Sequence, residues 1–446
     1  MIKKVLVANR GEIAVRIIRA CREMGIETVA VYSQADEEAL HTQLADEAIC
    51  IGPASSSESY LNMEQIISAT LVSGADAIHP GFGFLSENSK FVELCEKCNI
   101  TFIGPSSEVI QKMGNKAQAR STMIEAGVPV IPGSKEAVRE VSHGIEIAEE
   151  IGYPVMIKAA LGGGGKGMRV AENRETFAAS FQTAQKEAQM AFGDGTMYLE
   201  RFVRNPRHIE FQILADCYGN VIHLGERDCS IQRNHQKMIE ESPSVVIDEE
   251  LRSRMGQAAV QAAKAAGYTN AGTIEFLLER DGQFYFMEMN TRIQVEHPVT
   301  EWVTGIDLIQ EQIRIASGLP LSYRQEDIKL SGHAIECRIN AENPDKNFRP
   351  SPGTITDLYL PGGKGVRIDT AIYSGYTVPA YYDSMLAKLI VHADTREQAI
   401  SKMRTALGEV IIEGIDTNID YQYEIMNHPD YQSGKIDIEF ISKWQR

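Results

Sequence analysis

The sequence predicts a protein that is part α/β and part α+β, with a parallel sheet near the N-terminus and a larger mixed β/α region after it. The first roughly 110 residues alternate β-rich runs with helical patterns, which is typical of βαβ units on a parallel sheet. Further along, two β-rich runs flank Asp281 and Gly282, and this dipeptide is a strong signal for a β-hairpin. With 446 residues, the chain is long enough for about two to four domains.

The N-terminal elements follow one another closely. Strands are expected over 3–8, 28–32, 77–79 and 101–103, and an amphipathic helix over 12–24. Because no GxGxxG motif follows the first strand, binding of a nicotinamide dinucleotide is only weakly supported. Residues 79–87 form a glycine-punctuated loop at a strand end, which is where open α/β sheets bind their ligands.

The composition excludes several classes of protein. The formal net charge of −17 argues against a general binder of nucleic acids or anionic membranes, because such proteins are normally basic. No apolar run approaches the roughly 20 residues that span a bilayer, and the first residues do not resemble a signal peptide, so we expect a cytoplasmic protein. The seven cysteines are scattered, which does not suit a disulfide framework, and Cys95 and Cys98 are expected to be ordinary thiols.

A glycine-rich loop follows a short apolar strand in the middle of the chain. Residues 162–167 contain five glycines and Lys166, and the successive backbone N–H groups of such a loop form a concavity that binds anions. The loop is not a Walker A motif, because Gly167 rather than Ser or Thr follows the lysine. A flexible surface loop is the alternative interpretation. Lys158, which ends the preceding strand, favours phosphate binding because it places a positive charge next to the loop.

The segment 288–298 has the highest density of polar side chains that can take part in catalysis or ligand binding. In an extended strand, alternate residues share one face. The polar residues that would share a face here are Glu288, Asn290, Arg292, Gln294 and Glu296. A half-exposed strand with its polar side in water is the alternative. At about 3.3 Å per residue, such a row would lead from a metal–phosphate site towards a second substrate.

The preceding hairpin places a second carboxylate beside this row. If Asp281 and Gly282 form a two-residue turn, Arg280 pairs with Gln283, and counting outward brings Glu275 opposite Glu288. Two carboxylates that face each other across a β-ladder repel, and a divalent cation between them would remove the repulsion. Carboxylate and amide oxygens suit Mg²⁺ or Mn²⁺ rather than zinc.

Several segments together resemble one known family over nearly the whole chain. They are 8–16, 102–105, 158–167, 227–230, 235–237, 288–298 and 336–342. The combination is similar to the biotin carboxylase family of the ATP-grasp superfamily. The resemblance implies a Rossmann-like N-terminal domain, a helical connector, a small mobile lid domain with the glycine-rich loop, and a large C-terminal domain of the ATP-grasp fold. Their expected bounds are 1–112, 113–130, 131–203 and 204–446.

The resemblance also implies a nucleotide site and a metal site. The residues expected to bind ATP are Lys116, Lys158, Gly163, Gly164, Gly165, Lys166, Gly167, Glu200, His208, Gln232, His235, Glu275 and Glu288. Glu275, Glu288 and Asn290 would hold Mg²⁺ or Mn²⁺, and we expect two such ions. For each histidine, a purely structural role is the alternative.

The catalytic residues implied by the resemblance are Glu296, Arg338, Lys237 and Arg292. Bicarbonate would bind Lys237, Arg292, Gln294 and the backbone of Val295. Glu296 is similar to the general base of the family, and the neighbouring cations favour its ionised form. The base would prepare bicarbonate to attack the γ-phosphate of ATP, which gives carboxyphosphate, and Arg338 would stabilise the enolate of biotin. A closing lid would exclude water from the carboxyphosphate.

The partners follow from what the sequence lacks. It contains neither a Met-Lys-Met biotin attachment sequence nor a carboxyltransferase domain, so the resemblance implies biotin on a separate carrier protein and separate carboxyltransferase subunits. This is the organisation of the multi-subunit acetyl-CoA carboxylase, which makes malonyl-CoA for fatty acid synthesis. A homodimer is expected, with Arg19 and Glu23 of the first helix at its interface. Phe82 stands where some members of the family have Tyr, so a role for a phenol hydroxyl is lost here.

Three alternatives remain open at this point. The chain could serve another carboxylase, such as one for propionyl-CoA or pyruvate, because these enzymes share the same motifs. It could be an ATP-grasp carboxylate–amine ligase, although such an enzyme would not need the set Lys237, Arg292, Gln294, Glu296 and Arg338. A non-catalytic nucleotide-binding regulator would be favoured by a degenerate metal pair, and the sequence shows none.

Overall fold

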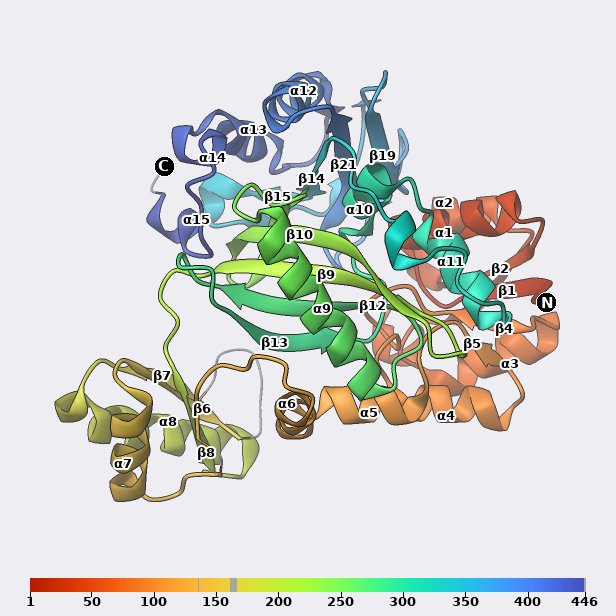
Figure 1. Cartoon of the computed structure of the whole chain (residues 1–446). Coiled ribbons are helices and arrows are strands. Elements are labelled where there is room, and N and C mark those ends of the chain that lie inside the picture. Colours follow the sequence, from red (N-terminus) through yellow and green to blue (C-terminus); the bar gives the residue numbers. More distant parts are fainter. Residues whose placement is uncertain (135, 161–166, 445–446) are drawn as a thin grey trace. The chain divides into compact units, whose positions relative to one another are not determined.

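The computed structural model of the chain describes residues 1–134, 136–160 and 167–444 (Figure 1). These residues form two compact units. Unit 1 comprises 1–122, 207–276 and 288–446, and unit 2 comprises 123–206 and 277–287. Within the described residues, no helix has both the length and the apolar character required to cross a bilayer.

The N-terminal sheet of unit 1 has five parallel strands in the order β3-β2-β1-β4-β5. The strands are β1 (Lys4–Val7), β2 (Glu27–Ser33), β3 (Glu47–Gly52), β4 (Ala77–His79) and β5 (Thr101–Phe102), and the helices are α1 (Gly11–Glu23), α2 (Leu40–Leu44), α3 (Met63–Ser73), α4 (Ser89–Lys97) and α5 (Ser107–Gly114), with short 3₁₀ turns η1 (Gln34–Asp36) and η2 (Ser56–Glu58). Val5 and Val7 pack into a core with α1, whereas Leu6 packs into a second core with α3 and α4. A parallel sheet that is apolar on both faces needs helices on both sides, and the predicted parallel sheet is confirmed.

The second sheet has eight strands in the order β13-β12-β9-β10-β11-β14-β21-β19 (Figure 1). They are β9 (Arg207–Ala215), β10 (Val221–Arg233), β11 (Gln236–Ser242), β12 (Asn270–Leu278), β13 (Phe284–Asn290), β14 (His333–Asn340), β19 (Val366–Thr370) and β21 (Met385–Ala393). Alternate residues of β14 lie on opposite faces of the sheet. Ile335 and Cys337 join an apolar core, whereas Glu336 and Arg338 lie outside that cluster. Because the side-chain period of a strand is two, this register gives the sheet one apolar and one polar face around β14.

Helices and short strands complete unit 1. They are α9 (Glu249–Ala266), α10 (His297–Thr304), α11 (Leu308–Ala316), α12 (Arg396–Glu409), α13 (Ile419–Asn427), α14 (Pro429–Gln432) and α15 (Phe440–Lys443), η3 (Gln325–Asp327) and η4 (Pro344–Lys346), and β15 (Glu342–Asn343), β16 (Arg349–Pro350), β17 (Gly353–Thr354), β18 (Leu358–Tyr359), β20 (Thr377–Val378) and β22 (Ile411–Ile412). The apolar face of β14 and β21 packs against α12 and α13, whose Met403 and Ile425 are fully buried. The opposite face of these strands therefore remains available for polar side chains.

Unit 2 contains a three-stranded antiparallel sheet in the order β7-β6-β8. Its elements are β6 (Val155–Ala159), β7 (Met168–Ala171), β8 (Met197–Arg201), α7 (Val141–Ile151) and α8 (Arg174–Phe192), and α6 (Lys116–Glu125) crosses from one unit into the other. Phe177 and Phe181 of α8 stack and fill the core beneath β6. The strand that carries Lys158 therefore has a rigid support.

The tip of the β12–β13 hairpin corrects the predicted turn. The N–H of Glu279 donates to the carbonyl of Gln283 (2.8 Å), and that of Gly282 donates to the carbonyl of Glu279 (3.1 Å). The loop therefore has three residues rather than two, and the pairing of Arg280 with Gln283 was wrong. The expectation that Glu275 lies opposite Glu288 was counted from that pairing and loses its basis. Gly282 has a φ of +83°, which suits the left-handed position that closes such three-residue hairpin loops.

A buried ion cluster attaches the C-terminal helices to the large sheet. Glu241 of β11 accepts from Arg396 of α12 (2.7 Å) and lies 2.7 Å from the imidazole of His333. Arg396 also donates to the carbonyls of Tyr431 and Gln432, which belong to α14. Burial alone would raise the pKa of Glu241, but His333 and Arg396 lower it from 4.5 to about 2. The carboxylate is therefore more stable in the folded chain than in the unfolded chain.

This depressed pKa predicts an acid-dependent loss of stability. The contribution of Glu241 is fully present above pH 4.5 and is lost as the pH falls towards about 2, since the carboxylate is then protonated in the folded state as well. We expect Glu241→Gln to lower the free energy of unfolding at pH 7 and to flatten its dependence on pH in this window. Urea titrations at several pH values, followed by tryptophan fluorescence, measure both effects, because Trp302 and Trp444 lie in unit 1. An unchanged pH dependence would contradict the assignment.

Candidate active site

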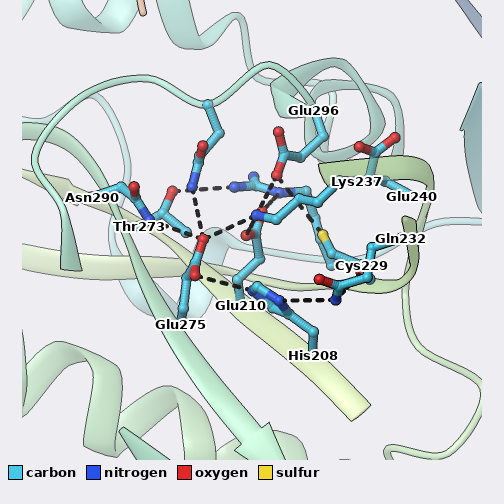
Figure 2. A network of polar contacts seen from close by, with 12 residues as sticks. His208, Glu210, Cys229, Gln232, Lys237, Glu240, Thr273, Glu275, Asn290 and Glu296 are labelled. Atoms are coloured by element: carbon cyan, nitrogen blue, oxygen red, sulfur yellow. Dashed lines mark hydrogen bonds and ion pairs between the residues drawn. The ribbon is translucent and has the colours of Figure 1, made fainter. Parts of the chain in front are cut away.

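A network of polar side chains surrounds Lys237 on the large sheet of unit 1 (Figure 2). The ammonium of Lys237, on β11, donates to Glu210 (2.5 Å), Glu275 (2.9 Å) and Glu296 (2.7 Å). Glu210 comes from β9, Glu275 from β12, and Glu296 from the residue that precedes α10. Burial opposes the positive charge, but the three carboxylates outweigh it and raise the pKa of Lys237. Lys237 is therefore a cation that joins three elements distant in sequence.

A second cation lies entirely inside the sheet. Arg227 has no exposed surface, and its guanidinium donates to Glu210 (2.5 Å). It also donates to the side chains of Gln212 (2.7 Å), Thr300 (2.9 Å) and Thr273 (3.1 Å). Glu210 therefore accepts from two cations, one on each oxygen. Neither Glu210 nor Arg227 was predicted as a site residue, although Arg227 lies in the segment 227–230, which contributes to the family resemblance.

Glu296 is held as a carboxylate between two cations. It is fully buried, one oxygen accepts from Lys237, and the other accepts from Arg338 on β14 (3.0 Å). Burial would raise its pKa, but Lys237, Arg338 and Arg227 together hold the pKa well below its ordinary value. A group in this state can accept a proton at neutral pH. The sequence predicted Glu296, Lys237 and Arg338 as site residues, and the structure brings these three together.

Arg338 has a second carboxylate partner that the sequence analysis did not predict. Its Nε donates to Glu240 (2.7 Å), which is fully buried on β11. Glu240 lies directly opposite Glu336 in the β11–β14 ladder, and both side chains are buried. Burial raises the pKa of Glu240 to about 7, although Arg338 acts in the opposite direction. The guanidinium of Arg338 is therefore positioned between Glu240 and Glu296.

The segment 288–296 is not one extended strand. Strand β13 ends at Asn290, and the next regular element is α10, which begins at His297 with a proline in its first turn. The predicted single polar face was therefore wrong beyond Asn290. Asn290 at the end of β13 and Gln294 in the irregular backbone nevertheless converge, since both side-chain amides donate to Glu275, at 2.9 and 3.1 Å.

Arg292 connects this irregular segment to the N-terminal sheet. Its guanidinium donates to Glu87 (2.8 Å), Gln294 (2.8 Å) and Asn290 (3.1 Å). Glu87 ends the glycine-punctuated loop after β4, and its second oxygen accepts from the backbone N–H of Thr291 (3.0 Å). The loop at the carboxyl end of the parallel sheet therefore contacts the large sheet next to the network around Lys237.

The predicted metal ligands fit a hard divalent cation. Glu275 is buried, and His208 and Lys237 lower its pKa despite its burial. Burial, followed by the negative charge of Glu275, raises the pKa of Glu288, which is the signature of two carboxylates that repel each other. A cation between them would remove this repulsion, and the oxygens of Glu275, Glu288 and Asn290 are the ligands that Mg²⁺ prefers.

The remaining predicted nucleotide residues fall into three groups. Gly163, Gly164, Gly165 and Lys166 lie outside the described residues. In unit 2, Lys158 and Glu200 form an ion pair on neighbouring strands, and Gly167 has a φ of +68°. In unit 1, His208 lies 3.1 Å from Glu275 and 3.5 Å from Gln232, whereas Lys116 and His235 are exposed. His235 occupies a left-handed position in the β10–β11 turn, with a φ of +64°.

Family models match the chain from one end almost to the other. They are the Biotin carboxylase, N-terminal domain (1–110), the Carbamoyl-phosphate synthase L chain, ATP binding domain (115–324), and the Biotin carboxylase C-terminal domain (336–443). Biotin carboxylase 1 of Bacillus subtilis is 59% identical over 445 residues, which cover 100% of this chain and 99% of that protein. One of the pyruvate carboxylase subunits of Methanothermobacter thermautotrophicus is 53% identical over 446 residues, which cover 100% of this chain and 91% of that protein.

The chain also superposes on solved structures of biotin carboxylases. Biotin carboxylase of Campylobacter jejuni, solved as a β-γ-ATP complex, superposes with a TM-score of 0.94 at 53% identity and covers 100% of this chain and 99% of that chain. The biotin carboxylase domain dimer of Hydrogenobacter thermophilus 2-oxoglutarate carboxylase, solved with MgADP, ADP and bicarbonate, gives a TM-score of 0.91 at 52% identity and covers 99% and 98%.

The fold, the site and the ATP-binding domain model define the class of protein as an ATP-dependent ligase. The chain belongs to the biotin carboxylase family. The predicted ATP-grasp fold and the predicted enzyme class are confirmed. A carboxylate–amine ligase and a non-catalytic regulator are therefore set aside.

The fully buried Arg227 yields a stability prediction. Arg227→Met should lower the free energy of unfolding by about 3–5 kcal/mol, because it leaves Glu210 buried with one cation fewer. Arg324→Met is the control, since its pair with Glu326 is exposed and should contribute less than about 1 kcal/mol. Urea titration followed by tryptophan fluorescence measures both variants. Equal effects of the two substitutions would show that burial does not set the strength of the Arg227 pair.

Proposed function

We propose that the chain carboxylates biotin on a separate carrier protein, using ATP and bicarbonate, as the first half-reaction of an acetyl-CoA carboxylase. One observation carries the chemical part of the proposal. The carboxylate of Glu296 lies between Lys237 and Arg338, and Arg292 and Gln294 belong to the same network. A base (Glu296), two cations (Lys237 and Arg292) and an amide (Gln294) are the groups needed to hold and deprotonate a small planar anion.

Bicarbonate is proposed to bind Lys237, Arg292, Gln294 and the backbone of Val295. A guanidinium suits a planar oxyanion because its N–H groups form a fork, and the ammonium adds a point charge. Arg292 is fixed by Glu87, so its orientation does not depend on the substrate. The solved relative from Hydrogenobacter thermophilus contains bicarbonate and MgADP, which supports bicarbonate as the anion that this site binds.

Glu296 is proposed to remove the proton of bicarbonate. The oxygen of bicarbonate would then attack the γ-phosphate of ATP, and the products are carboxyphosphate and ADP. Transfer of a phosphoryl group depends mainly on positioning and on neutralisation of charge. Glu275, Glu288 and Asn290 are proposed to hold Mg²⁺ or Mn²⁺, which would neutralise charge on the phosphates. The low pKa of Glu296 keeps the residue ionised at neutral pH, which is the state that a general base needs before it takes a proton.

Arg338 is proposed to act in the second step. Carboxyphosphate would break down to CO₂ and phosphate, the phosphate would take the N1′ proton of biotin, and the biotin enolate would attack CO₂. A fixed cation stabilises negative charge where it develops. Glu240 also accepts from Arg338, so the guanidinium is held by two carboxylates and does not have to reorganise during the reaction.

The residues proposed to bind the nucleotide come from several segments of the chain. The residues are Lys116, Lys158, Gly163, Gly164, Gly165, Lys166, Gly167, Glu200, His208, Gln232 and His235, together with the metal ligands Glu275 and Glu288. The match of 115–324 to an ATP-binding domain model supports this set, because it includes every one of these residues.

The parent complex is the finer part of the proposal. Relatives named biotin carboxylase support an acetyl-CoA carboxylase, whereas the relative from a pyruvate carboxylase supports the alternative of a pyruvate or related carboxylase. A carrier protein, carboxyltransferase subunits and a homodimer with Arg19 and Glu23 of α1 at its interface are proposed partners; the dimer reported for the Hydrogenobacter domain supports the last. The cytoplasmic location stays a prediction.

The function is tested by measuring ADP release with Mg²⁺, ATP and bicarbonate, with and without free biotin. We expect biotin to stimulate ADP release and labelled bicarbonate carbon to appear on biotin. Absence of both results would contradict the proposal. Adding purified carrier and carboxyltransferase subunits with either acetyl-CoA or pyruvate as acceptor then identifies the parent complex.

Replacement of the proposed base should abolish most turnover. We expect Glu296→Gln to lower kcat by roughly two to four decades while nucleotide binding stays nearly intact, since loss of a general base has effects of this size. ADP release and a nucleotide-binding titration check the two parts. Unchanged turnover would remove Glu296 from the role of base.

Replacement of Arg338 should separate the two steps. We expect Arg338→Gln to reduce carboxylation of biotin far more than bicarbonate-dependent cleavage of ATP, because only the biotin step develops an enolate. Parallel measurement of carboxybiotin and ADP tests this. An equal loss of both activities would argue against enolate stabilisation by Arg338.

A further inference from the structure

A fully buried lysine, Lys388, lies on β21 outside the set of residues assigned to the reaction. Its side chain has no exposed surface. A buried ammonium is strongly unfavourable unless it is paired and hydrogen-bonded. The groups that contact Lys388 therefore indicate its role.

Lys388 makes its hydrogen bond to the backbone of the proposed bicarbonate site. Its ammonium donates to the carbonyl oxygen of Val295 at 2.9 Å. That carbonyl belongs to the peptide that joins Val295 to Glu296. The residue proposed to bind bicarbonate and the proposed base therefore share a peptide group that Lys388 fixes.

The acidic neighbours of Lys388 are weaker partners. Glu12 of α1 lies 3.2 Å away, but neither of its carboxylate oxygens has a hydrogen-bond partner among the described residues. Asp369 lies 3.9 Å away and already accepts two hydrogen bonds from Arg367, at 2.8 and 2.7 Å. The ring of Phe82 lies 6.0 Å from the ammonium and covers it with an apolar surface. The position of Lys388 is thus better explained by Val295 than by an ion pair.

The peptide that Lys388 fixes lies in irregular backbone. Residues 291–296 belong to neither a helix nor a strand. The backbone hydrogen bonds next to this peptide are long, 3.4 Å from His297 to Gln294 and 3.3 Å from Val299 to Glu296. A side-chain donor supplied by the neighbouring strand β21 therefore restrains the peptide where the local backbone restrains it little.

We propose that Lys388 is a positioning residue, which holds the Val295–Glu296 peptide so that the bicarbonate site and the base keep a fixed geometry. The inference rests on the proposed function, because it concerns the geometry of that same site. Lys388 does not touch the substrate, and it acts through the backbone of Val295. A misplacement of about 1 Å at a reacting centre can lower the rate about 100-fold.

The test compares Lys388→Met with Glu12→Gln. The first substitution removes the hydrogen bond to Val295, whereas the second removes the ion pair and keeps the hydrogen bond. We expect Lys388→Met to lower kcat/KM for bicarbonate about 100-fold with little change in the KM for ATP, and Glu12→Gln to stay within about twofold of the unaltered chain. Hydrogen exchange of the amides in 293–298 should become faster in Lys388→Met alone.

The results for these variants either support or overturn the positioning role of Lys388. Equal losses in both variants, or an unchanged kcat/KM for bicarbonate in Lys388→Met, would overturn the inference and leave Lys388 as part of an ion pair. If Lys388→Met does not fold because Glu12 is left unpaired, the double variant with Glu12→Gln replaces it, and full bicarbonate-dependent activity of that variant overturns the proposal. If the unaltered chain itself shows no bicarbonate-dependent ADP release, the proposed function fails, and this inference fails with it.

Discussion

The placement of buried charge around Lys237 is the constraint on which the rest of the site depends. Charges are costly to bury, and they are tolerated only when each finds a partner in good geometry. Glu210, Glu275 and Glu296 share the ammonium of Lys237, while Arg227 and Arg338 supply the remaining cations. A shift of one residue in any of these strands would turn the charges into the apolar core. The electrostatic network and the register of the sheet therefore stabilise each other.

The same network fixes the proposed base. Because Lys237 and Arg338 contact different oxygens of Glu296, its carboxylate is ionised and cannot rotate freely. Arg292 is fixed by Glu87 from the loop that follows β4, so residues from both sheet regions of unit 1 contribute to the proposed anion site. Irregular backbone at 291–296 lets several polar groups converge that a straight strand would spread along its length.

Sequence reasoning succeeded where a signal is local. The alternation of β-rich runs with helical patterns predicted the parallel sheet, and the segment 288–298 supplied Asn290, Gln294 and Glu296, which the structure places in the network. It failed at the turn, where the three-residue loop closed by Gly282 replaces the expected two-residue turn. It also missed Glu210, Arg227 and Glu240. Every residue of β9 is buried, so its pattern does not distinguish a charged site residue from its apolar neighbours.

The sequence by itself determined the class of fold and the kinds of chemical group available, because both depend on residue type and on spacing along the chain. Only the tertiary structure decided which groups meet. Glu210, Lys237, Glu275 and Glu296 are brought together by the pairing of distant strands, and Lys388 reaches Val295 across 93 positions of the chain. Long-range packing sets these contacts, and no local pattern records them.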